Sequence, residues 1–202
     1  MTPEAARPLR ADARRNRERL LRVAVRALSQ PGRDVPLEDI AREAGVGIGT
    51  LYRHFPTREA LVEAAYRDEV ERLAAAAGEL LAEHPPDVAL RHWMDRFVDY
   101  MTTKRGMADA LRAVVAGGGD PYAVSRERLH AAVEQILGAA AAAGALRADV
   151  GPEDVLKAVS GVSLVTGDPA SPGAPGSPAQ REQAGRLLDL LLDGLRAGRT
   201  GD

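Results

Sequence analysis

The sequence predicts an all-α fold of about nine helices, and two observations carry this prediction. Apolar residues recur at intervals of three and four along most of the 202 residues, which is the spacing of a helix with one buried face. No stretch of useful length alternates apolar and polar residues, as a half-buried strand would. Apolar residues make up 45% of the chain, which is enough for a folded core. We expect two domains, over residues 1–57 and 58–202.

Proline and glycine divide the apolar pattern into elements. The first helix is expected over 12–29, before Pro31-Gly32, and the second over 37–44. The third is expected over 48–55, with Ile48, Leu51, Tyr52 and Phe55 as its apolar stripe and Pro56 as its end. The fourth, over 58–83, has Thr57 as its N-cap. The others are expected over 87–103, from Met107 to Gly117, and over 122–143, 153–166 and 180–197. Residues 167–179, rich in Pro, Gly, Ser and Ala, predict a flexible loop.

Charge is distributed unevenly along the chain. Residues 1–58 hold 12 Arg and 7 acidic residues, a net charge of +5. Residues 59–202 hold 15 basic and 22 acidic residues, a net charge of −7, so the whole chain carries −2. A basic N-terminal segment favours contact with a polyanion. Chance clustering of surface charge is the alternative.

Several classes of protein are excluded or disfavoured by composition. The chain has no Cys, which excludes disulfides, Cys-ligated metal centres and thiol catalysis. No apolar run approaches the ~18–20 residues of a membrane span, and no apolar segment follows the Arg-rich N-terminus, so we expect a cytoplasmic protein without membrane contact. The four His lack metal-ligand spacing, and no Gly-rich phosphate loop or Gly-x-Ser-x-Gly motif occurs. We therefore expect no catalytic residue, metal or cofactor.

The most informative segment runs from Val35 to Arg58. It contains two short predicted helices joined by Ala44-Gly45-Val46-Gly47. A glycine-containing turn between two short helices is typical of a helix-turn-helix. Gly45 is suited to the left-handed conformation that ends the first of these helices. An ordinary antiparallel pair of helices within a bundle is the alternative.

One face of the helix over 48–55 is suited to DNA. With Val46, Leu51 and Phe55 buried, the opposite face is small at its start and cationic at its end. Such a face fits the DNA major groove, where small residues let the backbone approach base edges, while hydroxyls and cations nearby hold phosphates. The candidate DNA contacts are Gly47, Gly49, Thr50, Tyr52, Arg53, His54 and Arg58, with Arg14 and Arg15 as possible phosphate contacts.

Short motifs in this segment resemble the N-terminal DNA-binding domain of the TetR family of bacterial transcriptional regulators. They are Ile40-Ala41, Ala44-Gly45-Val46, Thr50-Leu51-Tyr52 and His54-Phe55, followed by Arg58. The resemblance covers about residues 14–66, and the rest of the chain is similar to the family only in architecture. It implies that Thr50, Tyr52 and His54 touch DNA and that Arg58 binds a phosphate. Gly47 departs from the family pattern, which has a Ser or Thr cap at that position.

The resemblance also implies a biological role. The chain is expected to be a ligand-responsive repressor that binds a pseudo-palindromic, double-stranded DNA operator as a homodimer and responds to an unknown small-molecule effector. A transcriptional activator of the same fold is one alternative. A helical small-molecule-binding protein that has lost DNA binding is another.

The second domain carries a candidate effector pocket. Trp93, Phe97 and Met101 follow one another at single-turn intervals, and Tyr100 lies beside them in sequence. Sites for small molecules are mainly apolar with a few polar groups, although plain core packing explains the same pattern. The candidate lining residues are Trp93, Met94, Phe97, Met101, Met107, Tyr122 and Leu164.

The last two predicted helices carry a candidate dimer interface. Apolar residues recur along both helices, and two such helices from each subunit would form a four-helix interface. Packing within one chain is the alternative. The candidate interface residues are Val155, Val159, Val162, Leu187, Leu188, Leu191 and Leu195.

Overall fold

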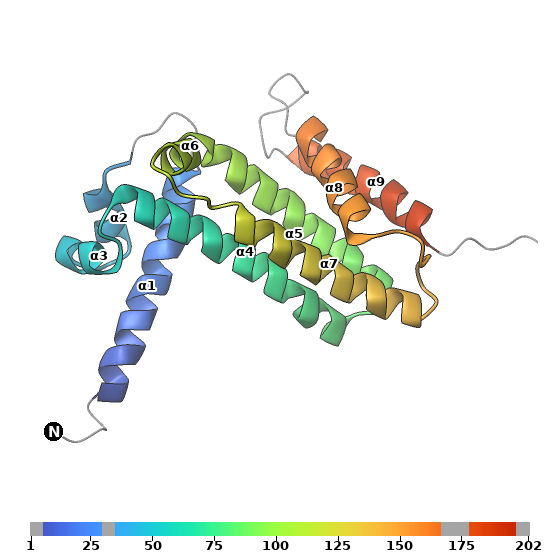
Figure 1. Cartoon of the computed structure of the whole chain (residues 1–202), viewed down its shortest axis with the longest axis horizontal. Coiled ribbons are helices and arrows are strands. Elements are labelled where there is room, and N and C mark those ends of the chain that lie inside the picture. Colours follow the sequence, from blue (N-terminus) through green and yellow to red (C-terminus); the bar gives the residue numbers. More distant parts are fainter. Residues whose placement is uncertain (1–5, 30–34, 167–177, 197–202) are drawn as a thin grey trace, which may run out of the picture. The chain divides into compact units, whose positions relative to one another are not determined.

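The computed structural model describes residues 6–29, 35–166 and 178–196. These residues form nine α-helices and no strand apart from one isolated antiparallel bridge between Leu146 and Arg196, which confirms the predicted all-α class (Figure 1). The helices are α1 (Ala6–Leu28), α2 (Leu37–Glu43), α3 (Ile48–His54), α4 (Arg58–Glu83), α5 (Pro86–Gly106), α6 (Ala108–Ala116), α7 (Ala123–Ala142), α8 (Pro152–Thr166) and α9 (Pro178–Leu195). No helix in the described ranges is long and apolar enough to cross a membrane.

Most helix ends lie close to the predicted ones, and the start of α1 is the largest difference. α1 begins at Ala6 rather than residue 12, because its first turns carry none of the apolar stripe from which the helix was predicted. Pro8 lies in the first turn, where the missing N–H has no intrahelical partner to lose. Of the loop predicted over 167–179, residues 167–177 lie outside the described residues. Pro178 and Ala179 are the first two residues of α9.

The chain divides into two compact units. Unit 1 contains the described residues up to Asp68 together with Thr103–Pro121, and unit 2 contains Glu69–Thr102 and the described residues from Tyr122 onwards. α4 therefore begins in unit 1 and ends in unit 2, and α5 runs in the opposite sense. The domain boundary between residues 57 and 58 stays a prediction.

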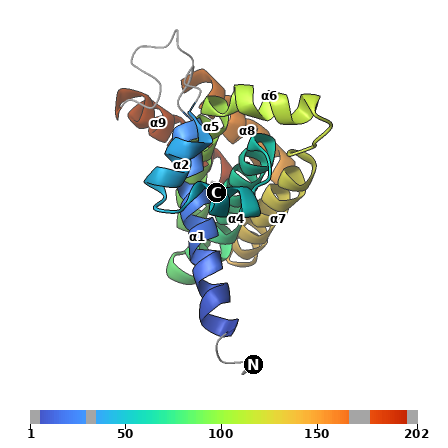
Figure 2. The same cartoon turned by 90° about the vertical axis from the view of Figure 1, so that its left-hand side faces the viewer.

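Unit 1 is built on the packing of α1, α2 and α3 against one another. Figure 2 shows α2 beside the C-terminal part of α1, where Arg26 forms an ion pair with Glu43. The core of these helices includes Leu20, Ile40 and Leu51, which are fully buried.

A second close contact in unit 1 joins the ends of two helices. Gly106, the last residue of α5, packs directly on the backbone of Ser29, which follows α1. A Cβ atom on Gly106 would lie 2.0 Å from the Ser29 carbonyl oxygen, so this position has no room for a side chain.

Unit 2 is a helical bundle in which α8 packs on both α7 and α9 (Figure 1). The indole N–H of the buried Trp93 in α5 donates a hydrogen bond of 2.9 Å to the Leu73 carbonyl oxygen in α4. Because a buried indole N–H needs an acceptor, this bond fixes the register between α4 and α5.

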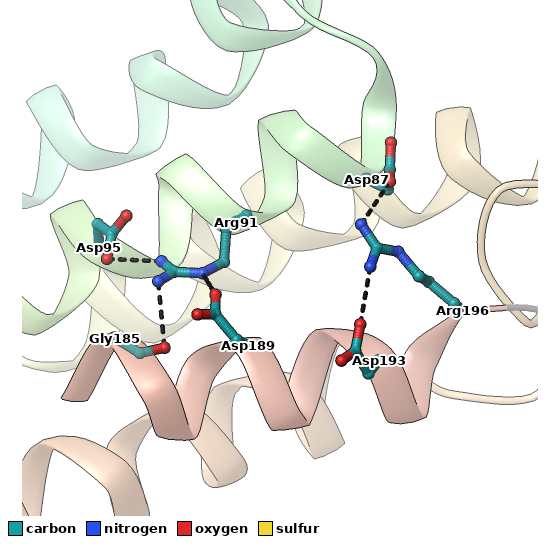
Figure 3. Close-up of polar contacts among 7 residues, drawn as sticks. All are labelled: Asp87, Arg91, Asp95, Gly185, Asp189, Asp193 and Arg196. Atoms are coloured by element: carbon teal, nitrogen blue, oxygen red, sulfur yellow. Dashed lines mark hydrogen bonds and ion pairs between the residues drawn. The ribbon is translucent and has the colours of Figure 1, made fainter. Parts of the chain in front are cut away.

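Two arginines join α5 to α9 (Figure 3). Arg91 of α5 places its Nε 2.6 Å from Asp189 Oδ1 and donates from Nη2 to the Gly185 carbonyl oxygen at 3.2 Å. Burial opposes its charge, but hydrogen bonds to Asp95 and Asp189 raise the pKa of Arg91. At the other end, Arg196 contacts Asp87 of α5 at 3.2 Å and Asp193 at 2.7 Å. These contacts hold α9 against the N-terminal half of α5.

Candidate nucleic-acid-binding surface

The turn between α2 and α3 is closed by glycine in the predicted way. Gly45 has φ +67°, the left-handed conformation, and its N–H donates to the Arg42 carbonyl oxygen at 3.1 Å. The Val46 N–H donates to the Ala41 carbonyl oxygen at 3.0 Å. These two bonds form a Schellman motif, which satisfies the last carbonyls of α2 and redirects the chain into α3.

Gly47 is the N-cap residue of α3. Its φ of −69° and ψ of 147° are ordinary extended values, and it has no side chain to accept a hydrogen bond from the first turn. Apart from their chain neighbours and the backbone of α3, no atom lies within 4 Å of the position where a Cβ on Gly47 or Gly49 would be. The start of α3 is therefore uncapped and sterically open.

The faces of α3 differ sharply in burial. Leu51 is fully buried in unit 1, as is Phe55 just after the helix, while Gly49 and Arg53 are exposed on the opposite side. At 100° per residue, Ile48 and Tyr52 lie on one edge of this exposed face, and Thr50 and His54 lie on the other. Of the predicted DNA contacts on or beside α3, Gly47, Gly49, Tyr52 and Arg53 are exposed, and Thr50 and His54 are half-buried.

The predicted apolar stripe of this helix needs a correction. Ile48 and Tyr52 were expected in the stripe with Leu51 and Phe55, but they are 37% and 44% exposed. The helix is only seven residues long, and unit 1 covers just one side of it. Ile48 was therefore missed as a member of the exposed face, because an apolar residue in sequence is ordinarily assigned to the core.

Arg58 has a contact that the sequence did not reveal. Its Nη1 donates a hydrogen bond of 2.7 Å to the carbonyl oxygen of Val35, in a partly buried position. This bond ties the first residue of α4 to the segment before α2. It orients the guanidinium beside the helix-turn-helix, and its contact with a phosphate stays a prediction.

The arginines of α1 are exposed and locally paired. Arg14 lies 3.5 Å from Glu18, and Arg15 forms an ion pair with Asp12. Arg17 lies over the ring of Phe55, with 5.6 Å from the guanidinium carbon to the ring centroid. Exposed ion pairs are worth about 0–1 kcal/mol, so they are weak competitors of a phosphate.

The candidate effector residues do not form a single group. Trp93, Met94 and Phe97 are buried in unit 2, and the rings of Trp93 and Phe97 lie 5.5 Å apart between centroids. Phe97 in turn lies 5.7 Å from Tyr100, which is also buried. We call Trp93, Phe97 and Tyr100 the α5 aromatic row. Met101 and Tyr122 are half-buried.

Two of the predicted pocket residues lie elsewhere. Leu164 is 67% exposed, so its assignment to the lining of an interior pocket was wrong. Met107 is buried but belongs to unit 1. The apolar pattern of a helix could predict neither the exposure of Leu164 nor the location of Met107 in unit 1, because it does not show which neighbour covers each residue.

The predicted dimer interface also needs correction. Val155, Val159, Leu188 and Leu195 are buried within the chain, so they form its own core and have no surface for a second copy. Val162, Leu187 and Leu191 are half-buried. The large apolar residues that α8 and α9 do expose are Leu164, Val165 and Leu190, which we call the α8–α9 apolar patch.

Family models match both parts of the chain. Residues 20–65 match the model described as bacterial regulatory proteins, tetR family. Residues 85–197 match the model of the transcriptional regulator SbtR-like C-terminal domain. The second match alone covers more than half of the chain, and the first covers the C-terminal part of α1, all of α2 and α3, and the start of α4.

Individual proteins give a consistent result. A TetR transcriptional regulator from Streptomyces coelicolor is 56% identical, with 89% of this chain and 98% of that chain covered and a TM-score of 0.80. A TetR transcription regulatory protein from Mycobacterium vanbaalenii is 36% identical, with 94% and 100% covered and a TM-score of 0.74. A curated HTH-type transcriptional regulator of Staphylococcus aureus is 36% identical over 81 residues, which are 39% of this chain and 42% of that protein. The match to that curated relative thus spans less than half of its length.

Proposed function

This chain belongs to the TetR family of bacterial transcriptional regulators, and from that premise we propose that it is a ligand-responsive repressor. It would bind a pseudo-palindromic DNA operator as a homodimer and release it when a small molecule binds in unit 2. The observation that carries the proposal is the exposed face of α3, which has two glycines at its start and Arg53 near its end. The proposed output is a change in DNA occupancy with no chemical reaction, in the cytoplasm where a bacterial chromosome lies.

The dimensions and chemistry of α3 suit a recognition helix. An α-helix with its side chains is about 10–12 Å across, and the major groove is about 12 Å wide. Gly49 lets the backbone approach base edges, and the Arg53 guanidinium is suited to bidentate hydrogen bonds with guanine or to a phosphate. The hydroxyl of Tyr52, at the edge of the same face, is suited to a phosphate.

A second copy is needed to recognise a palindromic site. One copy of α3 contacts one half-site, and a twofold dimer supplies the second about 34 Å away along the duplex, or at a multiple of that spacing. The α8–α9 apolar patch supports a dimer, because Leu164, Val165 and Leu190 are large apolar side chains that are 67%, 59% and 69% exposed. Two copies of α8 and α9 would bury these side chains in a four-helix interface.

The α5 aromatic row supports a response to a small molecule. Trp93, Phe97 and Tyr100 are the densest group of aromatic side chains in unit 2, and all three are buried. An apolar effector that packs among them would favour a different arrangement of α5. Because α4 and α5 both continue from unit 2 into unit 1, such a change reaches unit 1 through helical backbone. A coupling of about 1–3 kcal/mol lowers operator affinity about 5- to 150-fold.

The test is sequence-specific DNA binding by the full-length protein. Fluorescence anisotropy would be measured with duplexes from the promoter region of its own gene and with duplexes selected from a random pool. We expect a complex at moderate salt that survives excess random DNA. Arg53→Gln should weaken it at least about 30-fold, since a bidentate base contact is worth about 1–3 kcal/mol in each of the two half-sites.

The matched control is Arg126→Gln, which removes an exposed arginine from α7 in unit 2. This variant should bind operator as the wild type does. Absence of any sequence-specific complex, or equal losses in the two variants, would contradict the proposed function.

A further inference from the structure

An aliphatic side chain lies at one edge of the exposed face of α3, beside Tyr52. Ile48 is the first residue of the helix and is 37% exposed, whereas Leu51, one turn later, is fully buried. Isoleucine is β-branched and a weaker helix former than alanine, so helix propensity does not favour it here. Its exposed surface has no packing role in the described part of unit 1.

The neighbours of Ile48 make it prominent. Gly47 and Gly49 have no side chains, and beyond their chain neighbours and the α3 backbone no atom lies within 4 Å of where a Cβ on either would be. Neither adjacent residue therefore has a side chain that holds the start of α3 away from a surface, and the next large exposed side chain on the same edge is Tyr52, one turn later. In a helix-turn-helix protein, the N-terminal residues of the recognition helix are those that contact base edges. Ile48 is thus an apolar group at the end of α3 where bases are read.

The chemistry of the major groove selects a partner for an aliphatic side chain. The edges of adenine, guanine and cytosine present hydrogen-bond donors and acceptors, and thymine adds a C5-methyl group. Covering donors and acceptors with an aliphatic side chain leaves them unsatisfied, which is unfavourable. Packing the side chain on a methyl group removes apolar surface from water and is favourable.

We infer that Ile48 is a specificity-determining residue that packs on the C5-methyl of one thymine in each operator half-site. This inference rests on the proposed function, because it needs α3 in the major groove. It goes beyond that function by assigning a preference for thymine at one operator position to Ile48.

Replacement of thymine by deoxyuridine tests the contact directly, because it removes only the methyl group. The probe is an operator duplex selected from a random pool by the full-length protein. Each thymine is replaced in turn, at both symmetry-related positions. At one position the wild type should lose about 16-fold in affinity, or about fourfold per half-site, which corresponds to about 0.8 kcal/mol for one buried methyl.

The variant Ile48→Ala completes a double-mutant cycle. Alanine is a good helix former at this exposed position, so the variant should keep the fold, which circular dichroism would verify. It should lose less than about twofold on the same replacement, because it no longer covers the methyl. The control Val124→Ala shortens an apolar side chain that is 48% exposed on α7 in unit 2, and it should keep the 16-fold sensitivity.

The outcomes separate the two claims. If the full-length protein selects a specific duplex but Ile48→Ala keeps wild-type sensitivity at every thymine, the inference about Ile48 is wrong and the proposed function stands. A specific duplex with no methyl-sensitive position overturns the inference as well. If the protein selects no specific duplex, the proposed function and this inference fall together.

Discussion

Replacing Gly49 with alanine should stabilise the free protein and weaken its complex with DNA. Gly49 is in the first turn of α3, and a Cβ there would meet nothing within 4 Å. Alanine in a helix is favoured over glycine by about 0.5–1 kcal/mol. For a chain of this length, 1 kcal/mol raises Tm by about 2–4 °C, so a rise of about 1–4 °C is expected.

The same methyl group should hinder DNA binding. It would occupy the centre of the exposed face, where the proposed function places the base edges. An extra methyl in a closely packed contact costs about 1–3 kcal/mol, which corresponds to about a 5- to 150-fold loss of affinity for each half-site. Thermal unfolding followed by circular dichroism measures the first effect, and fluorescence anisotropy with the selected duplex measures the second.

Gly138→Ala is the matched control for both measurements. Gly138 is helical, exposed and equally open, but it lies in α7 of unit 2. It should give a similar rise in Tm with no change in DNA affinity. Gly49 does not lie against the base edges if Gly49→Ala binds operator as tightly as the wild type does, or if the control weakens binding to the same extent.

Two further predictions concern packing. Leu190→Asp places a charge in the α8–α9 apolar patch and should convert the dimer to a monomer of 21.4 kDa in light scattering. The control Val124→Asp should leave the dimer intact. A dimer that persists with Leu190→Asp would rule out this patch as the interface. Gly106→Ala should lower the stability of unit 1 by at least about 1–3 kcal/mol, because its Cβ would lie 2.0 Å from the Ser29 carbonyl oxygen. A Tm equal to that of Gly138→Ala would show that the Gly106 contact is not close.

Helix ends could be predicted where local chemistry decides them. Pro56 follows α3 closely, and Gly45 adopts the left-handed conformation that ends α2, as its position in the turn indicated. The start of α1 could not be predicted, because its first turns, from residue 6, carry none of the apolar stripe from which the helix was predicted. Without that stripe, only the weak helix propensities of the individual residues distinguish such a segment from a coil.

The exposure of individual side chains was harder to predict. Ile48 is apolar and has the spacing of a core residue, yet α3 is covered on one side only. α8 and α9 carry apolar residues on more than one face, so periodicity alone could not separate Val159, which is core, from Leu164, which is exposed. The contact of Arg58 with Val35 spans 23 residues and depends on the fold, which no local pattern encodes.

The central claim is that the exposed face of α3 lies in the major groove of two symmetry-related half-sites. Because the chain contains no cysteine, His54→Cys creates a single attachment point at the end of α3 for a DNA-cleaving iron chelate. On the selected duplex, the account predicts cuts at two major-groove positions related by twofold symmetry and a whole number of helical turns apart. A chelate on Arg126→Cys should give no such cuts. Equal cleavage from both attachment points would contradict the placement of α3 in the major groove. So would the absence of cleavage near a half-site with the chelate on His54→Cys.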